Sequence, residues 1–131
     1  VLVLLAATTP AEISRLRQLD QRRAGLQRII SDLATLSRSQ VSRTVLASCR
    51  MLTVGAPDIV QYTSYYLGQP LQRMGVATPT TPATGAYLAL ASDQSARFVL
   101  GHLEPGRGTN VPSGFRLVAG NRSWRLFTRG C

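Results

Sequence analysis

Two cysteines constrain the fold of this chain most, because a bond between them would tie its last strand to its helical half. Cys49 follows a long N-terminal helical pattern, and Cys131 is the final residue after an alternating apolar segment. A disulfide would close a loop of about 80 residues. The chain-entropy model predicts that such a bond stabilises the folded state by roughly 4 to 5 kcal/mol. Such a bond indicates an oxidising compartment outside the cytoplasm. The alternative is two buried free thiols that behave as small apolar side chains.

The N-terminal part carries the pattern of one long amphipathic helix. Thr9, Pro10 and Glu12 provide the cap, first position and capping-box acid of a helix start. Apolar residues then recur at steps of three and four, at Ile13, Leu16, Leu19, Leu26, Ile29, Ile30, Leu33 and Leu36. The sequence predicts a helix over 10–38, about 40 Å long. That length exceeds what so small a core needs, which suits a stalk-like or membrane-proximal N-terminal half. The apolar stripe is expected to pack on a sheet or a partner helix rather than on lipid.

Residues 1–9, ahead of this helix, begin with a short apolar run. Val1–Ala6 contains only Val, Leu and Ala, too few residues for a bilayer span of about twenty. It also lacks the positive start of a signal peptide. The run is consistent with the end of a transmembrane segment, with a buried strand, or with the first turn of a core helix.

Residues 50–131 alternate short helical and strand patterns, which predicts an α+β core. Ser39 is placed to cap a second helix ending at Cys49. A third helix is expected over 59–67, although its β-branched and aromatic residues also suit a strand. Strands are expected at 51–54, near Val76, and at 85–91, 96–103, 115–119 and 122–128. The expected fold is one domain over 1–131, with the long helix, one or two short helices and a mostly antiparallel sheet of four to six strands.

The last two expected strands flank Gly120-Asn121, a two-residue connection typical of a β-hairpin. A turn there would pair Leu117 with Trp124 on the core face, and Arg116 with Arg125 on the other face. Two arginines directly opposite each other are unfavourable unless an anion, a carboxylate or water separates them. Guanidinium groups match phosphate geometry, so the sequence predicts an anion site at Arg116 and Arg125, or else a solvated outer face.

Aromatic side chains offer a second kind of surface, because their faces stack on sugars while tyrosine hydroxyls hydrogen-bond. The candidates for such a platform are Trp124, Tyr62, Tyr65, Tyr66 and Tyr87. A core position is the alternative for Trp124. Tyr65 and Tyr66 are adjacent on the expected third helix and point apart, which leaves at least one of them exposed.

Catalytic and metal-binding patterns are weak in this sequence. The single histidine, His102, falls on an expected strand, and of six acidic residues only Asp93 and Glu104 lie near candidate loops. Two cysteines and one histidine lack the spacing of zinc ligands. Arg107 lies in a glycine-rich segment that could cradle a phosphate or a sugar hydroxyl, or be only a loop. We expect no catalytic residue, metal or cofactor here.

The net charge limits the classes of molecule that this chain is expected to bind. The net charge is +9, from fifteen arginines and six acidic residues, which suits nucleic acid, anionic lipid or a phosphate-bearing ligand. Nucleic acid is disfavoured, because clustered arginines with interleaved aromatics are absent from the sequence and the cysteines argue against the cytoplasm. A membrane surface or a lipid-linked substrate remains, beside a simply solvated basic surface.

The order of these features resembles a known family. An apolar start and an arginine-rich helix precede the segment Ser-Arg-Ser-Gln-Val-Ser-Arg-Thr-Val-Leu-Ala-Ser-Cys, which ends at Cys49; a short strand and a Trp124 hairpin ending in Cys131 follow. This order is similar to the C-terminal extracytoplasmic domain that follows the transmembrane helices of some actinobacterial polytopic membrane proteins. Those proteins are similar to mannosyltransferase-like glycosyltransferases that use polyprenyl-phosphate sugars. The resemblance spans the whole chain.

The resemblance implies a membrane-anchored accessory domain in the cell envelope, partnered by the membrane-embedded remainder of a glycosyltransferase-like polypeptide. It would assist binding of a glycan acceptor or a lipid-phosphate sugar, without catalytic residues of its own, because the family's catalytic carboxylates would lie in the membrane part. The expected ligand-binding residues are Tyr65, Tyr66, Arg107, Arg116 and Arg125. The alternative is a sensor or protein-interaction module that forms a homodimer through the stripe from Ile13 to Leu36.

Overall fold

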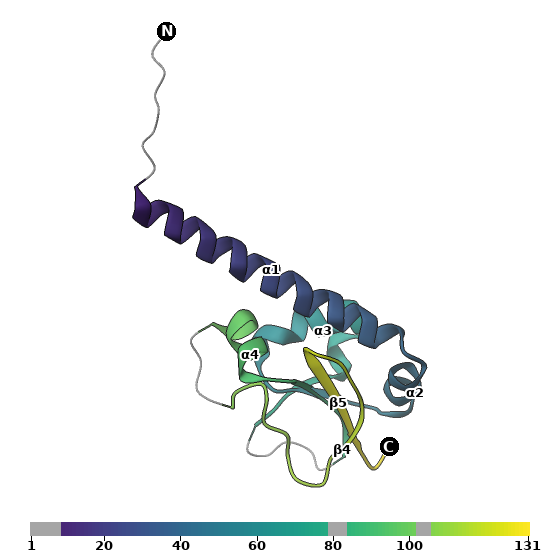
Figure 1. Cartoon of the computed structure of the whole chain (residues 1–131). Coiled ribbons are helices and arrows are strands. Elements are labelled where there is room, and N and C mark those ends of the chain that lie inside the picture. Colours follow the sequence, from purple (N-terminus) through teal and green to yellow (C-terminus); the bar gives the residue numbers. More distant parts are fainter. Residues whose placement is uncertain (1–8, 79–83, 102–105) are drawn as a thin grey trace.

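A computed structural model describes residues 9–78, 84–101 and 106–131 as a layer of helices packed on a five-stranded sheet (Figure 1). The helical elements are α1 (Pro10–Arg38), α2 (Gln40–Ser48), η1 (Pro57–Ile59), α3 (Val60–Leu67), η2 (Leu71–Arg73) and α4 (Asp93–Leu100), η marking a 3₁₀ turn. The strands are β1 (Leu52–Val54), β2 (Met74–Val76), β3 (Gly85–Leu90), β4 (Arg116–Gly120) and β5 (Trp124–Arg129). The α+β class, the long first helix and the strand number are confirmed.

The sheet has the order β2-β1-β3-β5-β4. β1 pairs in parallel with both β2 and β3, whereas β5 runs antiparallel to β3 and β4. Two of the four pairings are therefore parallel, and the sheet is mixed rather than mostly antiparallel. The crossover through α3 accounts for one of them, because it returns the chain to the same end of the sheet and makes β2 parallel to β1.

The start of α1 forms as its sequence predicts. The Thr9 hydroxyl accepts from the Glu12 amide at 3.4 Å, and the Glu12 carboxylate accepts from the Thr9 amide at 2.9 Å. This capping box satisfies backbone donors that the first turn otherwise leaves unpaired. The helix then continues to Arg38, where Ser39 ends it and caps α2 by accepting from the Ser42 amide at 3.1 Å.

The core lies between the C-terminal part of α1 and the sheet. Trp124 on β5 is 1% exposed, and its indole N–H donates to the Ile29 carbonyl oxygen at 2.8 Å. The turn after β4 is also attached to α1, because Asn121 Nδ2 donates to the Asp32 carbonyl oxygen at 2.6 Å. These bonds fix one end of the sheet against the helix that covers it.

The expected strand over 96–103 is wrong in its described part, because residues 96–100 belong to helix α4 and Gly101 is the C-cap of that helix. The Ser92 hydroxyl caps this helix by accepting from the Ser95 amide at 3.2 Å, and Asp93 lies in its first turn. Both features favour a helix start and outweigh the strand propensity of Phe98 and its neighbours. Residues 102 and 103, and with them the expected place of His102, lie outside the described residues.

The hairpin of β4 and β5 is confirmed, but its expected two-residue turn is wrong. The Asn121 side-chain oxygen accepts from the amides of Ser123 (3.1 Å) and Trp124 (3.0 Å), which lengthens the turn. An irregularity between Leu117 and Ala119 shifts the register of the strands further. Leu117 consequently lies opposite Phe127 and is 57% exposed, rather than facing Trp124 in the core.

Gly25 of α1 marks a close approach to α4 that gives a testable prediction. A Cβ built at Gly25 would lie 2.6 Å from the nearest ring carbons of Phe98. In an open helix interior, Gly→Ala gains about 1 kcal/mol. Here we expect Gly25→Ala to cost about 1 to 3 kcal/mol through overpacking, measured by urea unfolding. In a Phe98→Ala background the same change should stabilise; stabilisation in both backgrounds would contradict the predicted clash.

Candidate functional site

An open groove follows the segment that joins α2 to β1. One part, of about 420 Å³, is lined by Ser48, Cys49, Arg50, Met51, Thr84, Gly85, Gly130 and Cys131. A second part, of about 350 Å³, is lined by Ala47, Ser48, Cys49, Arg50, Met51, Gln72 and Arg73. Residues 48–51 line both parts, which together are named the basic groove. It opens at the end of the sheet where β1 and β3 begin.

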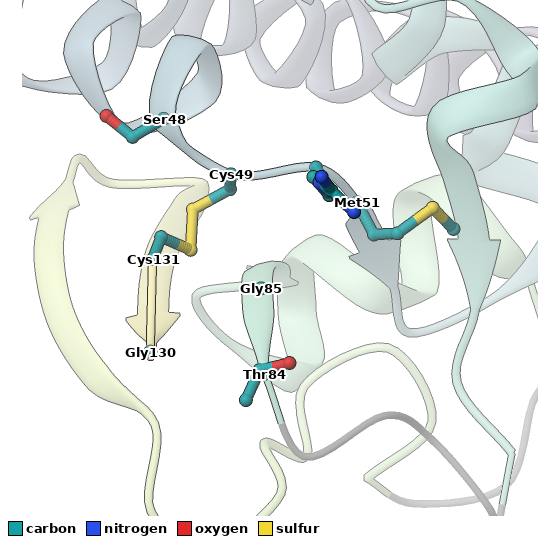
Figure 2. A pocket seen from close by; sticks show the side chains of 8 residues that line it. Ser48, Cys49, Met51, Thr84, Gly85, Gly130 and Cys131 are labelled. Carbon is teal, nitrogen blue, oxygen red and sulfur yellow. A yellow bond between two sulfur atoms is a disulfide. The ribbon is translucent and has the colours of Figure 1, made fainter.

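The Cys49–Cys131 disulfide forms one wall of the basic groove (Figure 2). The Cα atoms are 5.0 Å apart, and the bond joins residues 82 positions apart in the sequence. Cys49 is 5% exposed and its amide donates to the Val45 carbonyl oxygen at 2.9 Å, which fixes it at the end of α2. The predicted pairing of the two cysteines is therefore confirmed, and it holds the end of β5 beside the groove.

The floor of the basic groove depends on glycine at Gly85. This residue has a φ of 123°, and a Cβ there would lie 3.0 Å from the Met51 carbonyl oxygen. That oxygen accepts from the Ala86 amide at 3.0 Å, so the approach of the two strands is set by the backbone. A side chain at this position would be strained and would close part of the groove.

Arginine gives the basic groove its charge. Arg50 and Arg73 are both exposed, and the described lining residues contain no carboxylate side chain. Ser48 adds a hydroxyl group to both parts, Gln72 adds an amide group to the part that holds Arg73, and Thr84 adds a hydroxyl group to the other part. Two guanidinium groups beside neutral polar groups form a suitable surface for phosphate or carboxylate.

The five ligand-binding residues expected from sequence lie elsewhere, and none of them lines the basic groove. Arg116 lies opposite Thr128, whereas Arg125 lies opposite Ala89 on one side and Gly120 on the other. Because side chains alternate along β5, Thr128 and Arg125 point to opposite faces of the sheet. Arg116 and Arg125 consequently do not form the shared anion site that the two-residue turn predicted.

The aromatic platform is likewise only partly present. Tyr65 on α3 is 81% exposed, and its ring meets Tyr66 edge to face with centroids 5.1 Å apart. The expectation that one of this pair is exposed is confirmed. Trp124 and Tyr87 are buried at 1% and 2% exposure, so neither belongs to an exposed platform. The core alternative for Trp124 is the correct one.

Tyr87 supports the segment that carries Arg107. Its hydroxyl donates to the Asn110 carbonyl oxygen at 3.0 Å, and its ring packs on Phe115 at a centroid distance of 5.7 Å. Burial of this phenol raises its pKa above the ordinary value for tyrosine. Arg107 is exposed in this segment, in which Thr109 Oγ1 donates to Asp93 Oδ1 at 3.4 Å.

Sequence reasoning missed Arg50 and Arg73 as a pair. Arg50 directly follows Cys49, so the predicted disulfide already placed it near the chain end. Arg73 reaches the same groove only because β2 pairs in parallel with β1. That pairing has no local sequence signal, since it depends on the crossover through α3.

Searches of protein-family models, curated proteins and solved structures returned no similar chain. Among the helices in the described ranges, none combines the length and the apolar content required to span a bilayer. Residues 1–8, which hold most of the expected membrane-proximal run, lie outside those ranges. The described residues also contain no group of three or more His, Cys, Asp or Glu side chains arranged to hold a metal ion.

Proposed function

We propose that this chain is an extracytoplasmic accessory domain that holds the phosphate of a lipid-linked sugar in its basic groove. It would present that ligand to the membrane-embedded remainder of a glycosyltransferase-like polypeptide. The observation that carries the proposal is the convergence of Arg50 and Arg73 on one open groove whose described lining has no acidic side chain.

The chemistry of the groove suits a sugar phosphate better than a neutral glycan. Arginine forks bind phosphate oxygens through paired charge-assisted hydrogen bonds. The neutral polar groups of Ser48 and Gln72 line the part that holds both arginines and are suited to sugar hydroxyls, and Thr84 lines the adjoining part. Each part of the groove has a volume within the usual range for small ligands, about 300 to 1,000 Å³. An open groove also lets a lipid tail continue past the binding site.

Two further properties support the same function. The net charge of +9 raises the local concentration of anionic ligands around the domain. The Cys49–Cys131 disulfide is typical of proteins in oxidising compartments, where lipid-linked sugars serve as donors for envelope glycans. The disulfide also borders the groove, so the compartment marker and the binding surface belong to the same structural feature.

Nuclear magnetic resonance titration with a short-chain prenyl-phosphate mannose tests the proposal directly. We expect amide shifts at residues 48–51 and 72–73, and affinity about tenfold lower for Arg50→Gln and for Arg73→Gln, because each removes a charged hydrogen-bond donor. Arg43→Gln is the matched control, since Arg43 is exposed on α2 but does not line the groove.

The competing ligand chemistries give different results in the same titration. Methyl mannoside without phosphate should bind much more weakly than the prenyl-phosphate sugar, and inorganic phosphate should compete with it. Equal affinity of wild type, Arg50→Gln and Arg73→Gln would show that the groove is not the binding site. Shifts confined to Tyr65 and Tyr66 would instead favour a sugar surface on α3.

A further inference from the structure

The projecting part of α1, residues 10–24, exposes apolar side chains that no described element covers. Ile13, Leu16 and Leu19 are 40%, 57% and 61% exposed. Figure 1 shows this half of the helix extending beyond the sheet and the other helices. It is about 22 Å long at 1.5 Å per residue. Three exposed apolar residues on one face within about two helical turns are an unusual feature on a helix surrounded by water.

Leu16 and Leu19 belong to a heptad pattern whose later apolar positions are partly or fully buried in the body of the protein. With Leu16 at position a, Leu19 falls at d, and the later positions of the same pattern are Arg23, Leu26, Ile30 and Leu33. Leu26, Ile30 and Leu33 line a small cavity together with Tyr62 of α3. In the body, α3 therefore occupies the place of a partner helix. Along the projecting part, the same face of α1 lacks such a neighbour among the described residues.

The charged residues beside the apolar face of the projecting part indicate which kind of partner would cover it. In the same heptad, Arg15 is at position g and Asp20 at position e. In a parallel, in-register pair of helices, g faces e five residues further along the partner. Arg15 of each copy would meet Asp20 of the other, and two-fold symmetry makes this pair twice. An antiparallel pair would place g against g, which brings arginines together. We infer that a second copy of this chain covers the projecting part of α1 in a parallel pair.

The pair is expected to be weak. Its contact spans about two helical turns and falls well below the roughly 1,000 Å² of a stable interface. Arg23 at the next a position also brings two like charges close to the axis of the pair. We expect a dissociation constant on the order of 0.1 to 1 mM in solution. Such an affinity is sufficient where copies share a membrane and are held in parallel at high local concentration. This inference does not depend on the proposed ligand of the basic groove.

Sedimentation equilibrium of the whole 131-residue chain up to millimolar concentration tests the apolar part of the contact. Leu16→Gln with Leu19→Gln should weaken association about 30-fold, because two leucines lose their burial against the second copy. Leu71→Gln is the matched control, since Leu71 is 58% exposed on η2 and far from this face in sequence. It should leave association unchanged.

Charge reversal tests the parallel arrangement. Arg15→Asp and Asp20→Arg should each weaken association, and the two together in one chain should restore it, because the g and e pairs re-form with exchanged signs. Residues five apart on one helix do not face each other, so the rescue reports on contact between copies. Circular dichroism of each variant verifies that α1 stays helical.

Cross-linking gives a separate readout of the same geometry. Leu16→Cys at position a should form a disulfide-linked dimer under mild oxidation, whereas Ser14→Cys, on the opposite side of α1, should not. Equal cross-linking of both variants, or a wild type that stays monomeric at millimolar concentration, would overturn the inference. Binding of the monomer to anionic vesicles that is lost in the double Leu→Gln variant would show that a lipid surface covers this face instead.

Discussion

Replacing both cysteines by alanine is expected to lower the free energy of unfolding by about 4 kcal/mol. The Cys49–Cys131 bond joins residues 82 positions apart, and without it the unfolded chain regains the freedom of that long loop. Urea unfolding followed by the fluorescence of Trp124, the single tryptophan in the sequence, measures the change. A loss of this size is a large share of the stability of a typical domain, about 5 to 15 kcal/mol.

Reduced wild-type protein is the control that separates the bond from the side chains. It keeps the buried sulfur of Cys49 but loses the cross-link, so it should resemble the double Ala variant to within about 1 kcal/mol. If the free energy of unfolding of the double Ala variant were less than about 1 kcal/mol below that of the oxidised protein, the chain-entropy model would not account for the effect of this bond. The same variants also bear on binding, because Gly130 and Cys131 line the basic groove. Affinity for the prenyl-phosphate sugar should fall when that wall is released.

Features fixed by neighbouring residues could be predicted from the sequence. The capping box at Thr9 and Glu12 and the cap at Ser39 involve contacts within one helical turn, so they were visible as short patterns. The disulfide was predictable for a different reason, because a chain with only two cysteines allows a single intramolecular pairing.

Features that depend on distant contacts, or on a choice between two local patterns, could not be predicted in this way. In α4 the Ser92 cap is a local helix signal, whereas Phe98 and Val99 suit a strand, and the packing of Phe98 over Gly25 of α1 is a distant contact without a sequence signal. The Asn121 hydrogen bonds that shape the hairpin turn reach only two and three residues along the chain, but Gly120-Asn121 is a competing turn signal. The later turn and the irregularity between Leu117 and Ala119 together place Arg116 opposite Thr128, three residues beyond Arg125.

The candidate site shows the same division. Arg50 could be located through its neighbour Cys49, whereas Arg73 enters the groove through the parallel pairing of β1 with β2. That pairing is set by the crossover of α3 over the sheet and by the burial of Leu52 and Val54. Composition revealed an excess of positive charge, but the fold determines which two of fifteen arginines share a groove.

Trp124→Ala is expected to cost about 3 to 5 kcal/mol, the second large effect in this protein. Trp124, on β5, is 1% exposed. Its indole N–H donates to the Ile29 carbonyl oxygen of α1 at 2.8 Å. Removing it leaves a cavity where the helix meets the sheet. Since no tryptophan remains, circular dichroism at the helix band should follow the urea transition.

A second variant separates the contribution of the indole hydrogen bond from that of apolar burial, and a third serves as a control. Trp124→Phe keeps most of the apolar volume but removes the N–H, and we expect a loss of about 2 kcal/mol from the hydrogen bond and the smaller ring. Leu117→Ala on the neighbouring strand is the control, because Leu117 is 57% exposed and should change stability by less than about 1 kcal/mol. If Trp124→Ala and Leu117→Ala had similar effects, Trp124 would not be the contact that holds α1 on the sheet. The long helix would then depend mainly on Ile29, Leu33 and Leu36.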